Sequence, residues 1–142
     1  GYFKNPEATK ETLLDGWLLT GDLGTMDADG YVFVKGRTKE LIIKGGENIA
    51  PREIDEALYE HPDVVDAAAF AVEEPHYGQE VEACVSLTSH SRCNSEELKE
   101  FCRPRLGDFK TPRKIHILEE LPKGPSGKIQ RLRLAEMTRS LS

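Results

Sequence analysis

The sequence predicts an α+β domain from about Lys39 onward, with a small mixed or antiparallel sheet flanked by helices. Val64 to Val72 form an almost continuous apolar run, as expected of a strand covered on both faces. Residues 81–88 alternate between apolar and polar side chains, which predicts a half-buried strand. Residues 94–107 carry apolar side chains at helical spacing. Strands and helices therefore intermix around one sheet.

The segment before this domain predicts a short helix followed by a β-hairpin. Asn5 and Pro6 provide a cap and a first turn for a helix that ends near Leu14. A turn at residues 27–30 separates two β-prone segments. This arrangement predicts a hairpin.

One segment follows the order strand, glycine pair, helix. Leu41 to Ile43 are apolar and β-prone, so we expect a short buried strand. The adjacent Gly45 and Gly46 allow positive φ and the close approach of another backbone or a ligand. Pro51 suits the first turn of a helix because it has no N–H group. An ordinary β-turn-helix connection also explains the glycines and the proline, but it leaves the charged residues before the strand unexplained.

Caps and helix breakers define the remaining elements. Asn94, with Glu97 three residues later, resembles a capping box and starts a helix that we expect to end at Gly107. Residues 114–118 alternate and predict a short strand, and residues 129–139 predict a basic amphipathic helix. The Pro, Gly and Ser residues between these two elements predict a loop.

The composition is that of a globular protein. With 142 residues, 38% of them hydrophobic and 31% charged, the chain is long enough for one domain with a core. No apolar run reaches a membrane-spanning length, so we expect a soluble protein, with the cytoplasm as the default location. The last residues do not form a peroxisomal tripeptide, although a peroxisomal location of a longer parent protein stays open.

Charge is distributed unevenly along the chain. Residues 103–142 carry ten Lys and Arg against four Asp and Glu, a net charge of +6. Because the whole chain has a net charge of −6, residues 1–102 have a net charge of −12. The basic C-terminal third predicts either an anionic partner or a solvated basic helix face. The acidic total argues against general nucleic-acid binding.

Cysteine and histidine spacing matches none of the common disulfide or metal patterns. Cys84, Cys93 and Cys102 are odd in number and form no C-x-x-C motif, so free thiols in a reducing compartment fit best. The four histidines are scattered, without consistent ligand spacing. The sequence therefore predicts no metal site.

Two charged residues stand out as candidates for a site. Lys128 follows a Gly-Pro-Ser-Gly segment that is not a P-loop, because only two residues separate the glycines and Ile129 follows the lysine. A lysine on such a short, stiffened loop can neutralise a phosphate or a developing anion, although a solvated surface lysine is the simpler alternative. Asp22 can accept hydrogen bonds from the two hydroxyls of a sugar, with a turn or cap role as its alternative.

Several segments together resemble the AMP-forming acyl-CoA synthetases, the adenylating superfamily that also holds the luciferases and the peptide-synthetase adenylation domains. The matching segments span nearly the whole chain in the family's order: GYFKNPEAT, DGWLLTGDLG, DGYVFVKGR, GRTKELIIKGGENIAPREIDEAL, FAVEEPHYGQEVEACV, LGDFKTPRKIHILEELP and PKGPSGKIQR. Among these enzymes, the small-acid ligases of the oxalyl-CoA and 4-coumarate type look most similar.

The resemblance implies a reaction in two steps. A carboxylate attacks the α-phosphate of ATP to give acyl-AMP and pyrophosphate, and the thiol of CoA then displaces AMP. Residues 1–38 would be the C-terminal end of a large AMP-binding domain, and residues 39–142 a small mobile domain that swings between two poses. The large domain would bind most of the ATP and Mg²⁺, so the chain alone is expected to be inactive.

The resemblance also gives roles to individual residues in the first step. Asp22 matches the carboxylate that binds the ribose of ATP, and Arg37 matches the arginine that reaches the ribose and phosphates. Lys39 occupies the hinge position. Lys128 matches the lysine that stabilises charge between the carboxylate and the α-phosphate during adenylation, and it would matter little for thioester formation.

A second group of residues matches positions that serve CoA. Gly45 and Gly46 match the strand edge that lines the pantetheine tunnel, where a side chain would block the arm. Tyr77 matches an aromatic residue that meets the adenine of CoA. Three more residues fall where relatives contact the CoA nucleotide: Phe109, Thr111 and Arg113.

Two alternatives remain beside an acyl-CoA synthetase. The thiol could belong to the phosphopantetheine arm of a carrier protein, but Tyr77 and the Phe109 to Arg113 segment favour free CoA, because a carrier protein needs no nucleotide pocket. The domain could also be degenerate and kept only for assembly. The presence of Asp22, Arg37 and Lys128 weighs against that alternative.

Overall fold

The computed structural model describes residues 5–141 of the chain. The chain divides into two compact units, Gly1–Lys39 and Glu40–Ser142, so the division lies one residue after the expected boundary. The first four residues of the GYFKNPEAT segment lie outside the described part.

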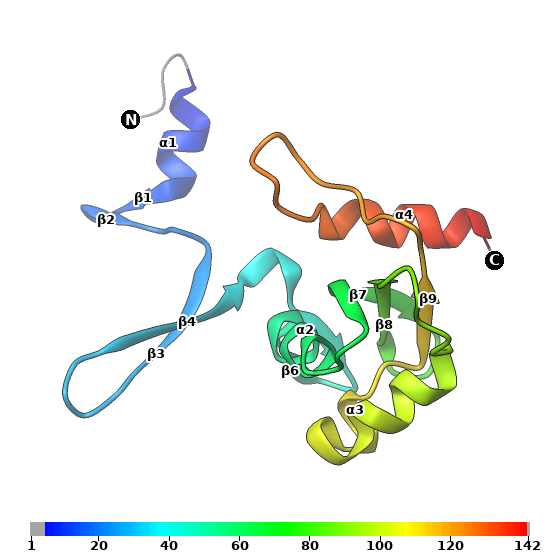
Figure 1. Cartoon of the computed structure of the whole chain (residues 1–142). Coiled ribbons are helices and arrows are strands. Elements are labelled where there is room, and N and C mark those ends of the chain that lie inside the picture. Colours follow the sequence, from blue (N-terminus) through cyan, green and yellow to red (C-terminus); the bar gives the residue numbers. More distant parts are fainter. Residues whose placement is uncertain (1–4, 142) are drawn as a thin grey trace. The chain divides into compact units, whose positions relative to one another are not determined.

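The described part of the N-terminal unit contains a short helix and two small hairpins (Figure 1). Its elements are α1 (Pro6–Thr12), β1 (Leu13–Leu14), β2 (Trp17–Leu18), β3 (Asp22–Met26) and β4 (Val32–Arg37). The Asn5 side chain accepts a hydrogen bond from the backbone N–H of Ala8 at 3.1 Å, which confirms the expected helix start. β3 pairs antiparallel with β4, which confirms the hairpin. No side chain of residues 5–39 is buried.

The C-terminal unit alternates strands and helices. A 3₁₀ helix, η1 (Thr38–Glu40), contains the boundary between the two units. The elements that follow are β5 (Ile42–Lys44), β6 (Glu47–Ile49), α2 (Pro51–Tyr59), β7 (Val64–Glu74), β8 (Gly78–Leu87), α3 (Ser95–Lys110), β9 (Lys114–Ile117) and α4 (Arg131–Leu141). The prediction of an α+β domain is confirmed.

These strands form one mixed sheet in the order β6-β5-β8-β7, and β9 also pairs with β8. The β8–β9 pair is parallel and the other pairs are antiparallel. β7 and β8 pair over their whole length, from Gly78 opposite Glu74 to Leu87 opposite Val64. The sequence did not predict β6, which forms where the chain folds back along β5 after the glycine pair.

Helices cover both faces of this sheet (Figure 1). The core between the sheet and the helices α2 and α3 consists of Ile42, Ile49, Ile54, Leu58, Ala67, Ala69, Val81, Ala83, Val85, Leu98, Cys102 and Ile115. The smaller core beneath α4 consists of Ala68, Phe70, Cys84, Leu121 and Leu134. Successive residues of β7 enter different cores, because side chains alternate between the two faces of a strand.

The prediction that residues 81–88 form a half-buried strand is wrong. Every residue of β8 from Glu80 to Ser86 is buried, because α4 covers the face that the sequence assigned to solvent. The polar side chains on that face have partners. Glu80 lies 2.7 Å from the Nζ of Lys44, and Glu82 lies 2.7 Å from the Nε2 of His116.

α3 begins with a complete capping box. Asn94 Oδ1 accepts a hydrogen bond from the N–H of Glu97 at 3.0 Å, and Glu97 Oε2 accepts one from the N–H of Asn94 at 2.9 Å, which confirms the predicted start. The predicted end is displaced by one turn. Gly107 has a left-handed φ of 76°, and the helix continues to Lys110 after this kink. No helix among residues 5–141 combines the length and apolar character that a membrane span needs.

Candidate functional site

Lys128 lies on an exposed loop between β9 and α4. The loop is closed by backbone hydrogen bonds from Gln130 N to Pro122 O and from Gly124 N to Lys128 O, each 2.8 Å long. Among the described residues, no carboxylate lies within ion-pair distance of the Lys128 ammonium. The structure therefore presents a solvated cation on a loop whose backbone is fixed by its own hydrogen bonds.

Gly45 and Gly46 form the turn between β5 and β6, and both have left-handed φ angles, of 55° and 83°. A Cβ atom on Gly45 would lie 3.3 Å from Cδ1 of Tyr77, so that site tolerates no added bulk without a shift. A Cβ atom on Gly46 would meet no atom within 4 Å. The Gly46 side of the turn is therefore an open edge without side chains.

Two aromatic rings lie beside this turn. The rings of Tyr77 and Phe109 meet edge to face with their centroids 6.4 Å apart, and both side chains are partly exposed. The Gly45 N–H donates to the Tyr77 carbonyl at 2.9 Å, which fixes the glycine turn to the β7–β8 turn. The structure thus brings together four of the residues that the sequence assigned to CoA.

Lys44 also belongs to this region, although the sequence alone did not indicate a role for it. Its ammonium lies 2.7 Å from the Glu80 carboxylate, donates to the Phe109 carbonyl at 2.8 Å and lies 4.7 Å from the centroid of the Phe109 ring. The side chains of Lys44 and Glu80 are both only 8% exposed. A lysine that ends an apolar strand was the available signal, but its partner could not be identified from local sequence.

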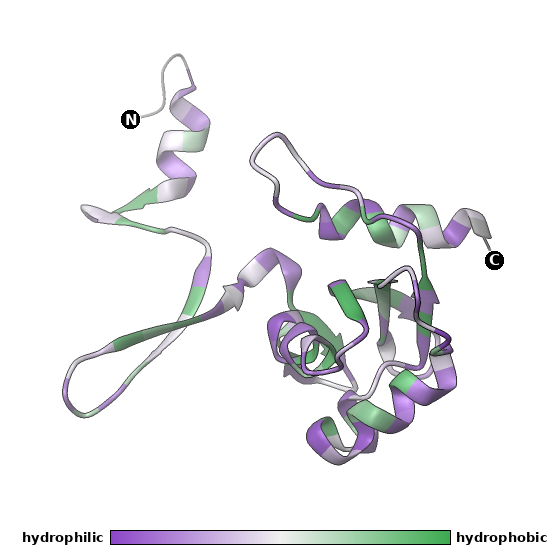
Figure 2. Ribbon diagram, viewed as in Figure 1, coloured by the Kyte–Doolittle hydropathy of each residue, from purple (hydrophilic) through white to green (hydrophobic). Residues whose placement is uncertain are grey.

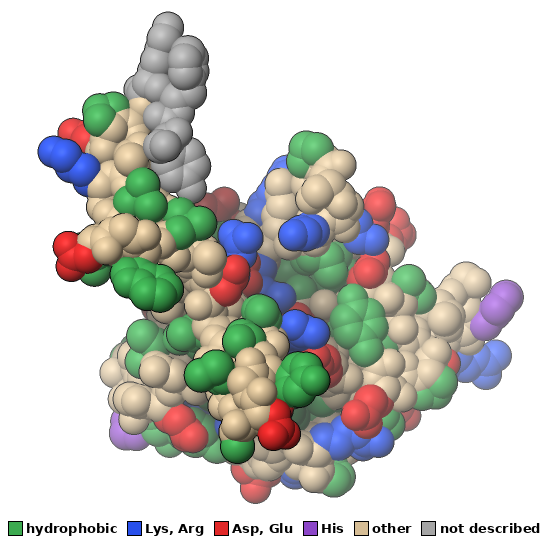
Figure 3. Space-filling model, turned by 90° about the vertical axis from the view of Figure 1, so that its left-hand side faces the viewer, with side chains coloured by type: hydrophobic (Ala, Val, Ile, Leu, Met, Phe, Trp, Pro, Cys, Tyr) green, Lys and Arg blue, Asp and Glu red, His purple; other side chains and the backbone are tan. Residues whose placement is uncertain are grey.

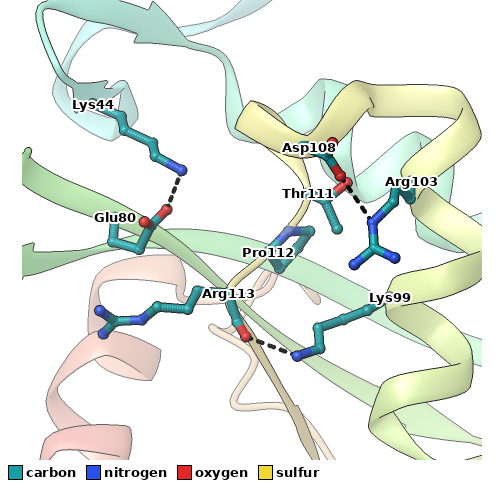
Figure 4. A pocket seen from close by; sticks show the side chains of 8 residues that line it. All are labelled: Lys44, Glu80, Lys99, Arg103, Asp108, Thr111, Pro112 and Arg113. Atoms are coloured by element: carbon teal, nitrogen blue, oxygen red, sulfur yellow. Dashed lines mark hydrogen bonds and ion pairs between the residues drawn. The ribbon is translucent and has the colours of Figure 1, made fainter.

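A polar pocket lies beside this cluster (Figure 4). Its lining consists of Lys44, Glu80, Lys99, Arg103, Asp108, Thr111, Pro112 and Arg113. Each lining cation has a carboxylate partner: Lys44 with Glu80, Lys99 with Glu96, Arg103 with Asp108, and Arg113 with Glu82. These lysines and arginines therefore differ from Lys128, because their charge is already compensated within the domain.

Thr111 and Arg113 both line this pocket, but their side chains differ in exposure. Thr111 is 7% exposed, and its hydroxyl donates to the Gly107 carbonyl at 2.7 Å, so it closes the end of α3. Arg113 is 53% exposed in its side chain and lies 3.5 Å from Glu82. The Arg113 guanidinium is thus accessible, whereas the Thr111 hydroxyl is used inside the fold.

The Lys128 loop and the glycine pair lie at opposite ends of β7. Lys123 of the loop pairs with Asp66, near the start of the strand, at 2.9 Å. Lys44, which precedes the glycine pair, lies opposite Gly78, beside the end of the strand. From Asp66 to the end of β7 at Glu74 there are eight residue steps, a length of about 26 Å at the usual rise per residue. The two regions are therefore attached to the sheet at well-separated positions along β7.

Asp22, Arg37 and Lys39 belong to the N-terminal unit. Asp22 and Arg37 are cross-strand partners in the β3–β4 hairpin, and the Arg37 Nε lies 3.5 Å from Asp22 Oδ1. Both side chains are exposed, so the pair is open to solvent. Asp22 and Lys39 also line one hollow of this unit, together with Thr20 and Thr38.

The thiol pKa values of all three cysteines are raised. Burial raises the pKa of the Cys84 thiol to about 12 and the pKa of the Cys102 thiol to about 11. Burial and the neighbouring Glu97 also raise the pKa of Cys93. Within residues 5–141 there is no group of three or more His, Cys, Asp or Glu side chains that could hold a metal ion.

Comparison with known proteins places these features in one family. The family described as "AMP-binding enzyme C-terminal domain" matches residues 53–128. A sulfoacetate–CoA ligase from Cupriavidus necator is 57% identical over 135 residues, which cover 94% of this chain and 26% of that protein. An oxalate–CoA ligase from Arabidopsis thaliana is 45% identical over 136 residues, which cover 96% of this chain and 26% of that protein. The chain thus spans about a quarter of the length of these relatives.

Solved structures of similar sequence have the same fold. ATP-bound MatB from Rhodopseudomonas palustris matches with a TM-score of 0.90 and 33% identity, over 99% of this chain and 28% of that one. The o-succinylbenzoate CoA synthetase MenE from Bacillus subtilis, in complex with its acyl-adenylate intermediate, matches with a TM-score of 0.88 and 37% identity, over 94% of this chain and 27% of that one. The fold and the resemblance predicted from the sequence are therefore confirmed.

Proposed function

This chain belongs to the family of AMP-binding enzyme C-terminal domains, and on that premise we propose that it is the mobile C-terminal domain of an AMP-forming acyl-CoA synthetase. The enzyme activates a carboxylate with ATP to acyl-AMP and then transfers the acyl group to CoA. Lys128 serves the first step, and the turn of Gly45 and Gly46 serves the second. Residues 1–38 are the end of the large AMP-binding domain, which binds most of the ATP and Mg²⁺ outside this chain.

The observation that carries this proposal is the separation of the two regions along β7. A solvated lysine at one end and an edge without side chains at the other can serve a common reaction centre only in turn. A domain that rotates between two steps requires such an arrangement. The matches to CoA ligases and to ATP-bound and acyl-adenylate-bound enzymes support the same chemistry.

The acyl group is selected outside this chain. Similar relatives include ligases named for sulfoacetate, oxalate and long-chain fatty acids, at 57%, 45% and 44% identity. One C-terminal domain thus occurs with acids of very different size and charge. This supports a role for the domain in the steps common to all of them, adenylation and thiol transfer.

Replacing Lys128 by Ala in the complete enzyme tests the first assignment. Because a preorganised cation next to the developing charge lowers the barrier, ATP–pyrophosphate exchange should fall by roughly two to three orders of magnitude. Thioester formation from preformed acyl-AMP should stay within about threefold of the unmodified enzyme. Lys114→Ala is the matched control, because Lys114 is also exposed on the C-terminal unit. An equal loss in both half-reactions would contradict the division of roles.

Replacing Gly46 by Leu tests the second assignment. The new side chain enters open space in the domain itself, so we expect it to obstruct the pantetheine arm and to lower the CoA step about tenfold or more, with adenylation largely retained. Gly30→Leu is the matched control, because Gly30 has a similar φ, 87° against 83°, and no neighbour within 4 Å. If both variants behave alike, backbone strain explains the loss and the tunnel assignment is wrong.

A further inference from the structure

Arg131 connects three segments of the C-terminal unit. Its NH1 group donates to the Ala69 carbonyl of β7 at 2.6 Å and to Asp55 Oδ1 of α2 at 3.2 Å. Its NH2 group donates to Asp55 Oδ2 at 2.8 Å, and its Nε donates to Glu40 Oε2 of η1 at 3.3 Å. One guanidinium therefore links a strand, a helix and the 3₁₀ helix at the start of the unit.

The two acidic partners of Arg131 occupy different environments. Asp55 has a side chain that is 12% exposed, and it also accepts a hydrogen bond from the Ala69 N–H at 2.6 Å. Burial raises the pKa of Asp55, and its bonds with Arg131 oppose that rise. Glu40 is 32% exposed and makes a single contact of 3.3 Å with Arg131. The contact of Arg131 with Asp55 is thus largely buried, whereas its contact with Glu40 is more open to solvent.

Arg131 also ends the loop that carries Lys128. The loop is a closed hairpin, with the bridge between Lys123 and Ile129 and the bond from Gln130 N to Pro122 O at its base. Arg131 follows directly as the first residue of α4. Arg131 is three residues from Lys128 and directly follows Gln130 at the base of the hairpin, so a shift of the Arg131 backbone also shifts that base.

Glu40, the other member of this ion pair, lies at the boundary between the two units. It is the last residue of η1 and the first residue of the C-terminal unit, directly after Lys39. The pair of Glu40 with Arg131 thus spans from the boundary to the lysine loop through one ion pair, although the two residues are far apart in the sequence.

We propose that Arg131 is a positioning residue whose contact with Glu40 couples the hinge to the Lys128 loop, so that the ammonium of Lys128 follows the rotation of the domain as part of one rigid body. The inference rests on the proposed function of Lys128 in adenylation. Arg131 and Glu40 themselves touch no substrate. Their effect acts through the placement of Lys128 and is confined to the step that uses this lysine.

Glu40→Gln is the decisive variant, because it removes the charge and keeps the size of the side chain. Arg131 retains its contacts with Asp55 and Ala69, so the domain should remain folded, with a melting temperature within about 2 °C of the unmodified enzyme. We expect kcat of adenylation to fall about tenfold, with the KM for ATP within about twofold. Thioester formation from preformed acyl-AMP should change less than twofold.

A matched control removes a comparable carboxylate elsewhere in the unit. Glu56 pairs with Arg52 on the exposed side of α2 at 2.9 Å. Glu56→Gln should leave both half-reactions unchanged. If it lowers adenylation as much as Glu40→Gln does, loss of surface charge explains the effect and the coupling is refuted.

The double variant Glu40→Gln with Lys128→Ala separates coupling from a general structural role. If Glu40 acts through Lys128, adding Glu40→Gln to Lys128→Ala causes no further loss of adenylation. A merely structural role predicts that the two losses multiply, and that outcome overturns the inference.

The single variants distinguish failure of this inference from failure of the proposed function. If Lys128→Ala leaves adenylation intact, the proposed function itself is wrong. If Lys128→Ala abolishes adenylation and Glu40→Gln does not affect it, the function stands and the coupling is wrong. Equal losses in both half-reactions of Glu40→Gln also contradict the coupling, because they place the effect on the rotation as a whole.

Discussion

The two units of this chain differ in how far their apolar side chains are buried. Residues 5–39 bury no side chain, although they contain many apolar residues (Figure 2). Apolar side chains of this unit are visible on its surface (Figure 3). Those that are exposed are Leu13, Leu14, Trp17, Leu18, Leu19, Met26, Tyr31, Val32, Phe33 and Val34. The C-terminal unit instead buries many of its apolar residues in two cores, one on each face of its sheet, although some others remain exposed.

This difference shows which unit contains the determinants of its own fold. A two-stranded hairpin is marginal in water without a covering layer. β4 has exposed apolar residues on both faces, with Val32 and Val34 on one side and Phe33 on the other, since side chains alternate along a strand. Apolar residues on both faces are typical of a strand inside a larger domain. This supports the proposal that the N-terminal unit is the end of such a domain.

Truncation of an apolar side chain in each unit should give the largest contrast. Leu58 is fully buried in the core beneath α2 and α3, so Leu58→Ala should lower the free energy of unfolding of this chain by about 2–5 kcal/mol. Phe33 is 51% exposed, so Phe33→Ala should change the free energy of unfolding by less than about 0.5 kcal/mol. Urea unfolding followed by circular dichroism measures both. A large effect of Phe33→Ala would mean that the N-terminal unit has a core of its own.

The buried thiols of the C-terminal unit should make its stability depend on alkaline pH. The pKa values of Cys84 and Cys102 are raised by burial to about 12 and about 11, from 9.0 in the absence of burial. Above pH 9 the unfolded chain loses these protons while the folded chain keeps them, so stability present below that pH is lost as pH rises. The loss from the two thiols together should be about 3 kcal/mol between pH 8 and pH 10.

Other groups also titrate in this range, so the thiol contribution must be isolated. The double variant Cys84→Ala and Cys102→Ala should be less stable at pH 8 but should show a flatter decline of the unfolding free energy toward pH 10. The N-terminal unit has no cysteine in residues 5–39 and offers no such contribution. An unchanged slope in the double variant would refute the assignment.

Local patterns predicted the elements whose causes are local. The capping box of Asn94 and Glu97, the helix start at Pro51 and the apolar run of β7 all appear at the expected places. The left-handed φ angles of Gly45 and Gly46 follow from the same kind of signal. Each of these features depends on residues within a few positions of one another, so the sequence contains the whole explanation.

The features that the sequence did not reveal depend on distant partners. β8 alternates as a half-exposed strand does, yet its polar face is buried because α4 covers it and because Lys44 and His116 pair with its glutamates. The Arg131 network joins residues that are as many as 91 positions apart. A prediction of burial from an amphipathic pattern assigns every polar residue to the solvent side. That prediction is wrong where a distant cation compensates a buried carboxylate.

The smallest predicted contrast compares two asparagine caps of the same type. Asn94 caps α3 of the C-terminal unit and Asn5 caps α1 of the N-terminal unit, each through its side-chain oxygen. Asn94→Ala should lower the unfolding free energy of this chain by about 1 kcal/mol, because an orphaned N–H at the helix start loses its partner. Asn5→Ala should leave the cooperative transition unchanged, because α1 contains no buried residue that couples it to a core. Thermal unfolding of both variants measures the difference. Equal shifts would mean that the two units unfold as one cooperative body, and the contrast between them would then concern burial alone.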